Sequence, residues 1–288
     1  MGTSIRSRKK SKKKQGKVKG GKVPPAAKTA DRYELYQRAV NSPDNDVDFL
    51  FDTYRAMRRK KPRHLREDFC GTAALAAEWL RRGKDLSAEG FDIDPEPVDW
   101  GYKHNFEPLG EAAARMTFHL KDVREPSQTP PDVRTAPNFS YWLFMTRKEL
   151  LAYFASARED LAPNGIFVID LYGGPEAMCE MEETRKIGGG VTYVWDQREY
   201  WPGTGEYECA IHFRFKDGSE MRSAFEYRWR FWHLTELKDL LLEAGFATVD
   251  GYFEGTDPDD ETQGDGNFEK DLRGENCEAW IAYLVAGK

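Results

Sequence analysis

The chain has 288 residues, a net charge of −6 and 40% hydrophobic residues, which is enough to build one full α/β core. Its longest apolar runs are too short to cross a bilayer, and no apolar segment follows the basic N-terminus as it would in a secretory signal. The four cysteines are scattered, without the spacing of a zinc site or of a disulfide framework. We therefore expect a cytoplasmic protein with reduced thiols and no bound metal.

Positive charge is concentrated at the N-terminus, where residues 1–22 hold ten of the 43 Lys and Arg residues and no acid. Such a segment cannot bury apolar surface, so residues 1–30 are predicted to form a disordered basic tail and linker. The tail could bind RNA phosphates, serve as a nuclear or nucleolar address in a eukaryote, or only increase solubility. The remaining chain has 33 basic and 49 acidic residues, which argues against its docking along a nucleic acid.

From residue 31 onward, segments with helical periodicity alternate with short apolar segments. Helices are predicted over 31–40, 46–59, 71–84, 95–106 and 146–161, and strands over 62–68, 86–94, 114–125, 130–142 and 164–174. The first two helices form a predicted cap, residues 31–60, that precedes a core over 61–174. Strands that alternate with helices predict a doubly wound, mostly parallel sheet.

The pattern changes after residue 174. Residues 188–232 contain three turn signals between alternating segments, which predict an antiparallel β insertion. Residues 233–288 return to a helix ending near Gly245 and to two strands that would complete a seven-stranded sheet. The acidic segment 256–276 is predicted to be a loop, and calcium is rejected because Lys270 stands where a calcium loop needs glutamate.

The turn after the first strand, residues 67–73, reads Glu-Asp-Phe-Cys-Gly-Thr-Ala. A dinucleotide pyrophosphate lies directly on the amides of such a turn and requires glycine at three positions. Here only Gly71 is glycine, and Phe69 and Ala73 take the other two positions. The sequence therefore disfavours an NAD-dependent oxidoreductase and favours a ligand without a phosphate that passes beside the turn.

This turn resembles the first motif of the class I S-adenosylmethionine-dependent methyltransferases, apart from Phe69 and Ala73. The segment ending in Asp92 resembles the second motif, and the sequence around Asp122 resembles the third. The resemblance covers residues 60–285 and implies a Rossmann-like methyltransferase fold with S-adenosyl-L-methionine as the cofactor.

The resemblance also implies roles for single residues. Glu67 would orient the turn and the methionine amino group, Asp92 would hold the ribose hydroxyls, and Asp122 would approach the adenine amino group. The implied cofactor-binding residues are Glu67, Phe69, Cys70, Gly71, Thr72, Asp92, Ile93, Asp122, Val123, Asn138 and Ser140. Simpler alternatives remain, because Asp92 could only cap the next helix and Asn138 and Ser140 could be ordinary turn residues.

Methyl transfer from a sulfonium is an in-line displacement that depends on positioning, without a metal or a covalent nucleophile. A base is needed only where the acceptor loses a proton, and the candidates are Tyr141, His212, Glu226 and His233. The acceptor is expected to be a small molecule in the aromatic-rich insertion, although those aromatics could simply bury the inner face of the sheet. Tyr33 and Tyr36 either close over the methionine carboxylate or pack against the sheet edge.

Two other functions are compatible with the sequence. One is an RNA- or ribosome-associated methyltransferase that is anchored by the Lys-rich tail. The other is a non-catalytic module that binds the cofactor or recruits a partner, a reading supported only by the two glycine replacements in the first motif.

Overall fold

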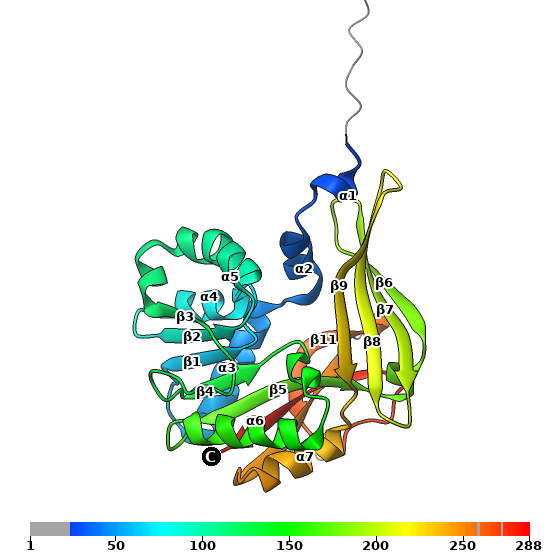
Figure 1. Ribbon diagram of the computed structural model, residues 1–288. Coiled ribbons are helices and arrows are strands. Elements are labelled where there is room, and N and C mark those ends of the chain that lie inside the picture. Colours follow the sequence, from blue (N-terminus) through cyan, green and yellow to red (C-terminus); the bar gives the residue numbers. More distant parts are fainter. Residues whose placement is uncertain (1–23, 258–259, 272) are drawn as a thin grey trace, which may run out of the picture.

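The computed structural model describes residues 24–257, 260–271 and 273–288, and the predicted basic segment 1–22 lies outside these ranges. Its larger sheet has eight strands in the order β11-β10-β12-β5-β4-β1-β2-β3 (Figure 1). These strands are β1 (His64–Asp68), β2 (Ser87–Asp92), β3 (Met116–Leu120), β4 (Val133–Ala136), β5 (Ile166–Gly173), β10 (Thr248–Asp257), β11 (Asp260–Lys270) and β12 (Trp280–Gly287). Strands β1 to β5 pair in parallel, and β12 is inserted antiparallel between β5 and β10. The predicted doubly wound, mostly parallel fold is confirmed.

Helices cover both faces of this sheet. They are α3 (Pro43–Arg58), α4 (Ala74–Arg81), α5 (Pro95–Gly101), α6 (Arg147–Asp160) and α7 (Leu234–Glu243). Helix α2 (Arg32–Val40) packs instead on the second sheet described below. Apolar residues of α3 and α4 form one core with the sheet, and those of α6 and α7 form the other. Thr146 caps α6 in a reciprocal capping box with Glu149.

Several segments differ from the prediction. The predicted strand over 130–142 ends at Ala136 as β4, and a 3₁₀ turn over Ser140–Leu143 follows it. Part of the acidic segment 256–276 is the edge strand β11, which pairs antiparallel with β10 and adds an eighth strand. The predicted helix over 95–106 remains α-helical only to Gly101, after which the chain forms a π-helix over Tyr102–Phe106 and a 3₁₀ segment over Glu107–Arg115. Residues of this irregular region pack over β3, where Phe106 and Phe118 meet edge to face.

The predicted insertion forms a separate four-stranded antiparallel sheet. Its strands are β6 (Met181–Lys186), β7 (Val191–Trp201), β8 (Glu206–Phe215) and β9 (Glu220–Arg230). The sheet begins with β6, before the predicted boundary at residue 188. The sequence does not indicate β6 because it is a mostly exposed polar edge strand without apolar alternation. Short 3₁₀ turns over Ser140–Leu143 and Pro175–Met178 follow β4 and β5.

Helix α2 lies between the two sheets (Figure 1). On one side, the side-chain amide of Gln37 donates to the Thr72 hydroxyl in the turn after β1, at 2.8 Å. On the other side, Arg38 donates to the carbonyl of Ile187 beside β7, at 2.9 Å. Within the predicted linker, a short helix α1 (Ala26–Thr29) meets the second sheet, where the Ala26 amide donates to Asp217.

A charged network is buried within the larger sheet. Arg66 on β1 and Arg134 on β4 are opposite each other in the parallel register. Both pair with Asp68 at 2.7 Å and with Asp160 of α6 at 3.0 and 3.2 Å, and all four side chains are almost fully buried. Both arginines also donate to the Val123 carbonyl at 2.6 Å, which fixes the segment after β3.

None of the described helices is long and apolar enough to cross a membrane. Cys70, Cys179, Cys209 and Cys277 are free thiols, as the sequence predicts.

Helix α5 packs directly on the backbone of the turn after β1. A Cβ atom added at Gly101 would lie 2.2 Å from the Thr72 carbonyl oxygen and 2.7 Å from the Thr72 Cα. We predict that Gly101→Ala lowers the free energy of unfolding by about 3 kcal/mol or more, because backbone cannot move aside as a side chain can.

The measurement is urea denaturation, with Gly203→Ala as the matched control. Gly203 lies in an exposed turn with no atom within 4 Å of an added Cβ, so this variant should unfold like the wild type. Equal stability of the two variants would contradict the close packing at Gly101.

Candidate active site

The turn after β1 alternates left-handed residues with right-handed or extended ones. Phe69, Gly71 and Ala73 have φ angles of 53°, 50° and 50°. These are the three positions at which the resembling motif carries glycine. The chain therefore keeps the backbone path of a glycine turn, although two of the three residues carry a Cβ atom. An L-residue in this left-handed conformation costs roughly 1–2 kcal/mol.

Hydrogen bonds hold this turn from several directions. The Gly71 amide donates to Asp92 Oδ2 at 2.8 Å, and the Cys70 amide donates to the Phe91 carbonyl at 3.0 Å. The Ala76 amide, in the first turn of α4, donates to Glu67 Oε2 at 2.9 Å. Glu67 is therefore held by the N-terminus of α4, and its role in orienting the turn and the methionine amino group stays a prediction.

The ring of Phe69 packs against the apolar core. Its centroid lies 6.2 Å from that of Phe144 and 5.9 Å from that of Tyr153. Cys70 is also buried, and burial raises the pKa of its thiol well above the usual value. Burial therefore disfavours the thiolate form of Cys70, which is the reactive form of a cysteine.

The carboxyl ends of β2 and β3 expose apolar side chains beside a carboxylate. Ile93 is 76% exposed and Leu120 is 55% exposed, and Leu120 is the register partner of Asp92. Large exposed apolar side chains next to a polar anchor are typical of ligand-binding surfaces. Burial raises the pKa of Asp92, although its hydrogen bonds from the Asp94 and Gly71 amides oppose the shift.

The predicted third-motif residues are held by arginines. Two hydrogen bonds from the Arg124 side chain to Asp122, at 2.9 and 2.6 Å, lower the pKa of this carboxyl group. Val123 is buried, and its carbonyl accepts the bonds from Arg66 and Arg134 described above. Asp122 remains partly exposed at this edge of the sheet.

The loop after β4 is anchored by an acid that the sequence analysis did not select. Asn138 and Phe139 are both left-handed, with φ angles of 58° and 57°. Their amides donate to the two carboxylate oxygens of Asp170, at 2.7 and 3.0 Å. Burial raises the pKa of Asp170 to about 7. Ser140 is occupied locally, since its hydroxyl donates to the Pro137 carbonyl.

A sequence signal for Asp170 was available. It follows directly after Ile169, the last residue of β5 that pairs with β4, and acids at that edge of the parallel part of a sheet face the ligand site. It was missed because the resemblance assigns no motif to β5.

The base candidates lie in different places. Tyr141 is fully buried, and its hydroxyl donates to the Asp170 carbonyl. Glu226 is exposed on β9 and pairs with Arg198 at 2.8 Å. His233 precedes α7 and lines a cavity of about 200 Å³ with Tyr172, Phe231 and Trp280. These candidates are not brought together at one site.

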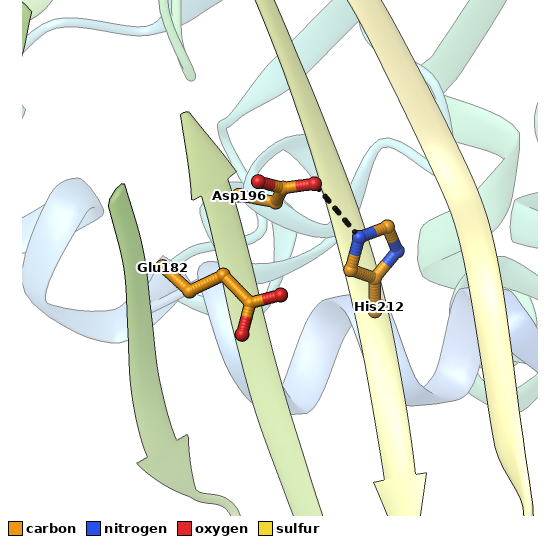
Figure 2. Close-up of side chains that lie close together, drawn as sticks. All are labelled: Glu182, Asp196 and His212. Carbon is orange, nitrogen blue, oxygen red and sulfur yellow. Dashed lines mark hydrogen bonds and ion pairs between the residues drawn. The ribbon is translucent and has the colours of Figure 1, made fainter. Parts of the chain in front are cut away.

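His212 belongs to a polar cluster on the outer face of the second sheet. Figure 2 shows His212 on β8, Asp196 on the adjacent strand β7 and Glu182 on β6, the next strand beyond β7. Both carboxylates are turned toward the His212 ring. His212 Nε2 lies 3.1 Å from Asp196, and its Nδ1 accepts from the Ser223 amide. The ring proton is thus on Nε2, and Arg198 and Arg214 pair with the two acids. Each of the three side chains therefore has a partner within the protein.

The inner face of the second sheet is lined by half-buried aromatic side chains. Tyr36 of α2 belongs to one apolar cluster with Tyr193 of β7 and Tyr227 of β9, and its ring centroid lies 4.9 Å from that of Phe225. Trp195 packs against Tyr227 and Trp229 with centroids 6.0 and 6.2 Å away. Tyr33 instead packs between Trp100 of α5 and Phe225 of β9, and its closure over the methionine carboxylate stays a prediction.

Glu67 makes stability depend on pH. Burial raises the pKa of this carboxyl group to about 8 from an ordinary value of 4.5, so the folded state binds a proton that the unfolded state has lost. The corresponding stabilisation is complete below pH 4.5 and disappears as the pH rises through 8. We predict that the unfolding free energy falls over this window by up to roughly 1.4 kcal/mol per pH unit for this group.

The measurement is urea denaturation at pH 5.5 and 8.0. In Glu67→Gln the fall should be smaller than in the wild type, because glutamine still accepts from Ala76 but does not titrate. Glu107→Gln, which alters an exposed acid, should keep the wild-type fall. An unchanged fall in Glu67→Gln would show that this carboxyl group does not carry the effect.

Comparison with known proteins gives a result at the level of the fold. No protein-family model and no curated protein matches the sequence. Solved structures do match. An S-adenosylmethionine-dependent methyltransferase from Clostridium acetobutylicum is 14% identical with a TM-score of 0.64, over 88% of this chain and 97% of that chain.

Two further structures are sugar-modifying enzymes. An amino pentose methyltransferase of calicheamicin biosynthesis from Micromonospora echinaspora is 18% identical with a TM-score of 0.63, over 90% of this chain and 97% of its own. A sugar N-methyltransferase from Streptoalloteichus is 16% identical with a TM-score of 0.59, over 99% and 98% of the two chains. The chain therefore has the fold of the class I S-adenosylmethionine-dependent methyltransferases.

Proposed function

We propose that this protein is an enzyme that transfers a methyl group from S-adenosylmethionine to a small-molecule acceptor by in-line displacement. The observation that carries the proposal is the turn at residues 69–73. Its three alternating left-handed residues follow the path of a glycine turn, and the Gly71 amide is tied to the acid at the end of β2. The retained path favours a working site over a non-catalytic module, whose sequence support was the loss of those glycines.

The residues around this turn fit the cofactor. Asp92 uses one lone pair of each carboxylate oxygen for the Gly71 and Asp94 amides, and the remaining lone pairs can accept from two ribose hydroxyls. Ile93 and Leu120 offer exposed apolar surface on which adenine can lie. Asp122 follows the end of β3 by two residues and remains partly exposed, which supports its predicted contact with the adenine amino group. When bound, the cofactor supplies an activated methyl group on a sulfonium.

The second sheet supports a small-molecule acceptor. Its aromatic inner face meets β5, where the Tyr172 hydroxyl donates to the Tyr207 hydroxyl at 2.7 Å and the Tyr172 ring packs against Trp195. Two of the structural neighbours act on sugars by their descriptions, and they carry this fold over nearly their whole length. We assign donor binding to residues 61–174 and acceptor binding to the insertion.

The proposal is tested by calorimetric titration of the protein with S-adenosylmethionine and S-adenosylhomocysteine. We expect dissociation constants in the micromolar range and no binding of NAD. Asp92→Asn should weaken both ligands by about 10- to 100-fold, because it replaces a charged acceptor of the ribose hydroxyls. Asp99→Asn, on an exposed position of α5, is the matched control and should bind like the wild type. If neither ligand binds the wild-type protein, the proposal is wrong.

A further inference from the structure

A cavity of about 200 Å³ lies beside the carboxyl end of β5, at the base of the second sheet. Its walls come from the end of β5, the start of β12, the turn after β5 and the segment between β9 and α7. Tyr172, Met178, Phe231, His233 and Trp280 are among its lining residues. His233 is exposed, so the cavity can be reached from solvent beside this ring. The proposed function gives this cavity no role.

Two successive glycines at the end of β5 shape the cavity. A Cβ atom added at Gly173 would collide with the ring of Trp280, and one added at Gly174 would collide with the Glu278 carbonyl. Gly174 also has a φ angle of 104°, which disfavours other residues. The absence of side chains at these two positions lets the segment before β12 lie against β5, and Trp280 thereby becomes a wall of the cavity.

Two other wall side chains are held in place by bonds within the protein. The Tyr172 hydroxyl donates to the Tyr207 hydroxyl at 2.7 Å, and the Trp232 indole donates to the Phe144 carbonyl at 3.2 Å. The guanidinium of Arg230 lies over the Trp232 ring, 3.7 Å from its centroid. Walls that are fixed before a ligand arrives reduce the ordering cost of binding.

His233 brings an unpaired polar ring to this cavity. The ring meets that of Phe231 at a centroid distance of 5.2 Å, and it forms no hydrogen bond or ion pair with the residues that the structure describes. A neutral imidazole has one nitrogen that donates and one that accepts. A ligand hydroxyl group can bond to either nitrogen, because it both donates and accepts.

The chemistry of the lining indicates a neutral ligand. None of the nine lining residues, all of them within the described ranges, is Asp, Glu, Lys or Arg. A charged ligand would lose hydration here without gaining a counter-ion. A sugar carries several hydroxyl groups, and the aromatic walls offer few partners for them. The lining therefore favours a ligand that has an apolar body and one polar group.

The size of the cavity indicates a single ring. An apolar cavity of about 150 Å³ is large enough to bind benzene. This cavity has about 200 Å³, so it has room for one aromatic ring with a small substituent. Aromatic side chains also attract the faces and edges of other aromatic rings, beyond the effect of the area that they bury.

We infer that this cavity binds a neutral aromatic ring that carries one hydroxyl group, a phenol, and that His233 is the hydrogen-bond partner of that hydroxyl group. The inference goes beyond the proposed function, because it assigns a ligand to a cavity that the proposed donor residues do not line. Binding there needs no methyl donor and can be measured in its absence.

The first experiment titrates the full chain, without S-adenosylmethionine, with phenol and with toluene, in which a methyl group replaces the hydroxyl group. We expect both probes to bind. His233→Phe should weaken phenol by about 5-fold and change toluene by less than about 2-fold, as expected for the loss of one neutral hydrogen bond. His104→Phe makes the same change at an exposed histidine outside the cavity, and it should bind both probes like the wild type.

The second experiment locates the site and tests its charge preference. In Met178→Trp a larger ring occupies the cavity, so the variant should bind neither phenol nor toluene. Benzoate and benzylammonium carry a charge on the same ring, and they should bind the wild type at least about 10-fold more weakly than phenol. Circular dichroism checks that each variant is folded.

The possible outcomes separate the two proposals. The inference is wrong if phenol does not bind the wild type, if His233→Phe keeps the wild-type affinity for phenol, or if a folded Met178→Trp binds both probes. Binding of benzoate or benzylammonium as tight as that of phenol would also contradict it. If Met178→Trp does not fold, the comparison of His233→Phe with His104→Phe decides alone. Failure of S-adenosylmethionine to bind would overturn the proposed function and leave this inference standing.

Discussion

The buried pairing of Arg66 and Arg134 with Asp68 and Asp160 is the constraint on which the site depends. It joins β1, β4 and α6, and it also holds the segment after β3 through the Val123 carbonyl. Removing one member of such a network leaves an unpaired charge in the core, at a cost of about 3–5 kcal/mol. The carboxyl ends of three strands, which carry the candidate ligand residues, are therefore fixed relative to one another.

This rigidity explains how the turn after β1 tolerates Phe69 and Ala73. A left-handed L-residue persists only where its surroundings fix the backbone more strongly than the strain opposes it. Here Asp92, Glu67 and the backbone contact with Gly101 hold the turn from three sides. The glycine pattern of the motif has changed while the backbone path that a ligand would meet has been kept.

The sequence predicted the alternation of strands and helices, the acids at the ends of β1 and β2, and the existence of an antiparallel insertion. It failed where the signal depends on tertiary pairing. Strand β6 is an exposed edge whose residues are nearly all polar, and β11 is rich in Gly and Asp, so neither has an apolar alternation. Each is a strand because a neighbour supplies its ladder.

For the candidate site, too, the sequence indicates some residues and misses others. Residues that match a motif could be assigned by position, whereas Asp170 could not, since its importance arises from the two left-handed amides that meet it from the loop after β4. The conformations of Phe69 and Ala73 were also beyond the sequence, because propensity argues against them. Conversely, His212 is satisfied by Asp196 and by the Ser223 amide, which a sequence cannot reveal.

Helix α2 makes the two halves of the molecule thermodynamically interdependent. It touches the turn after β1 through Gln37 and Thr72, and the insertion through Arg38 and through the bond from Arg185 to the Ala39 carbonyl. A ligand that orders α2 against one partner also orders it against the other. By linkage, two ligands bound on either side of this helix increase each other's affinity by the same factor, so donor and acceptor would load cooperatively through α2, apart from the contact between them that methyl transfer requires.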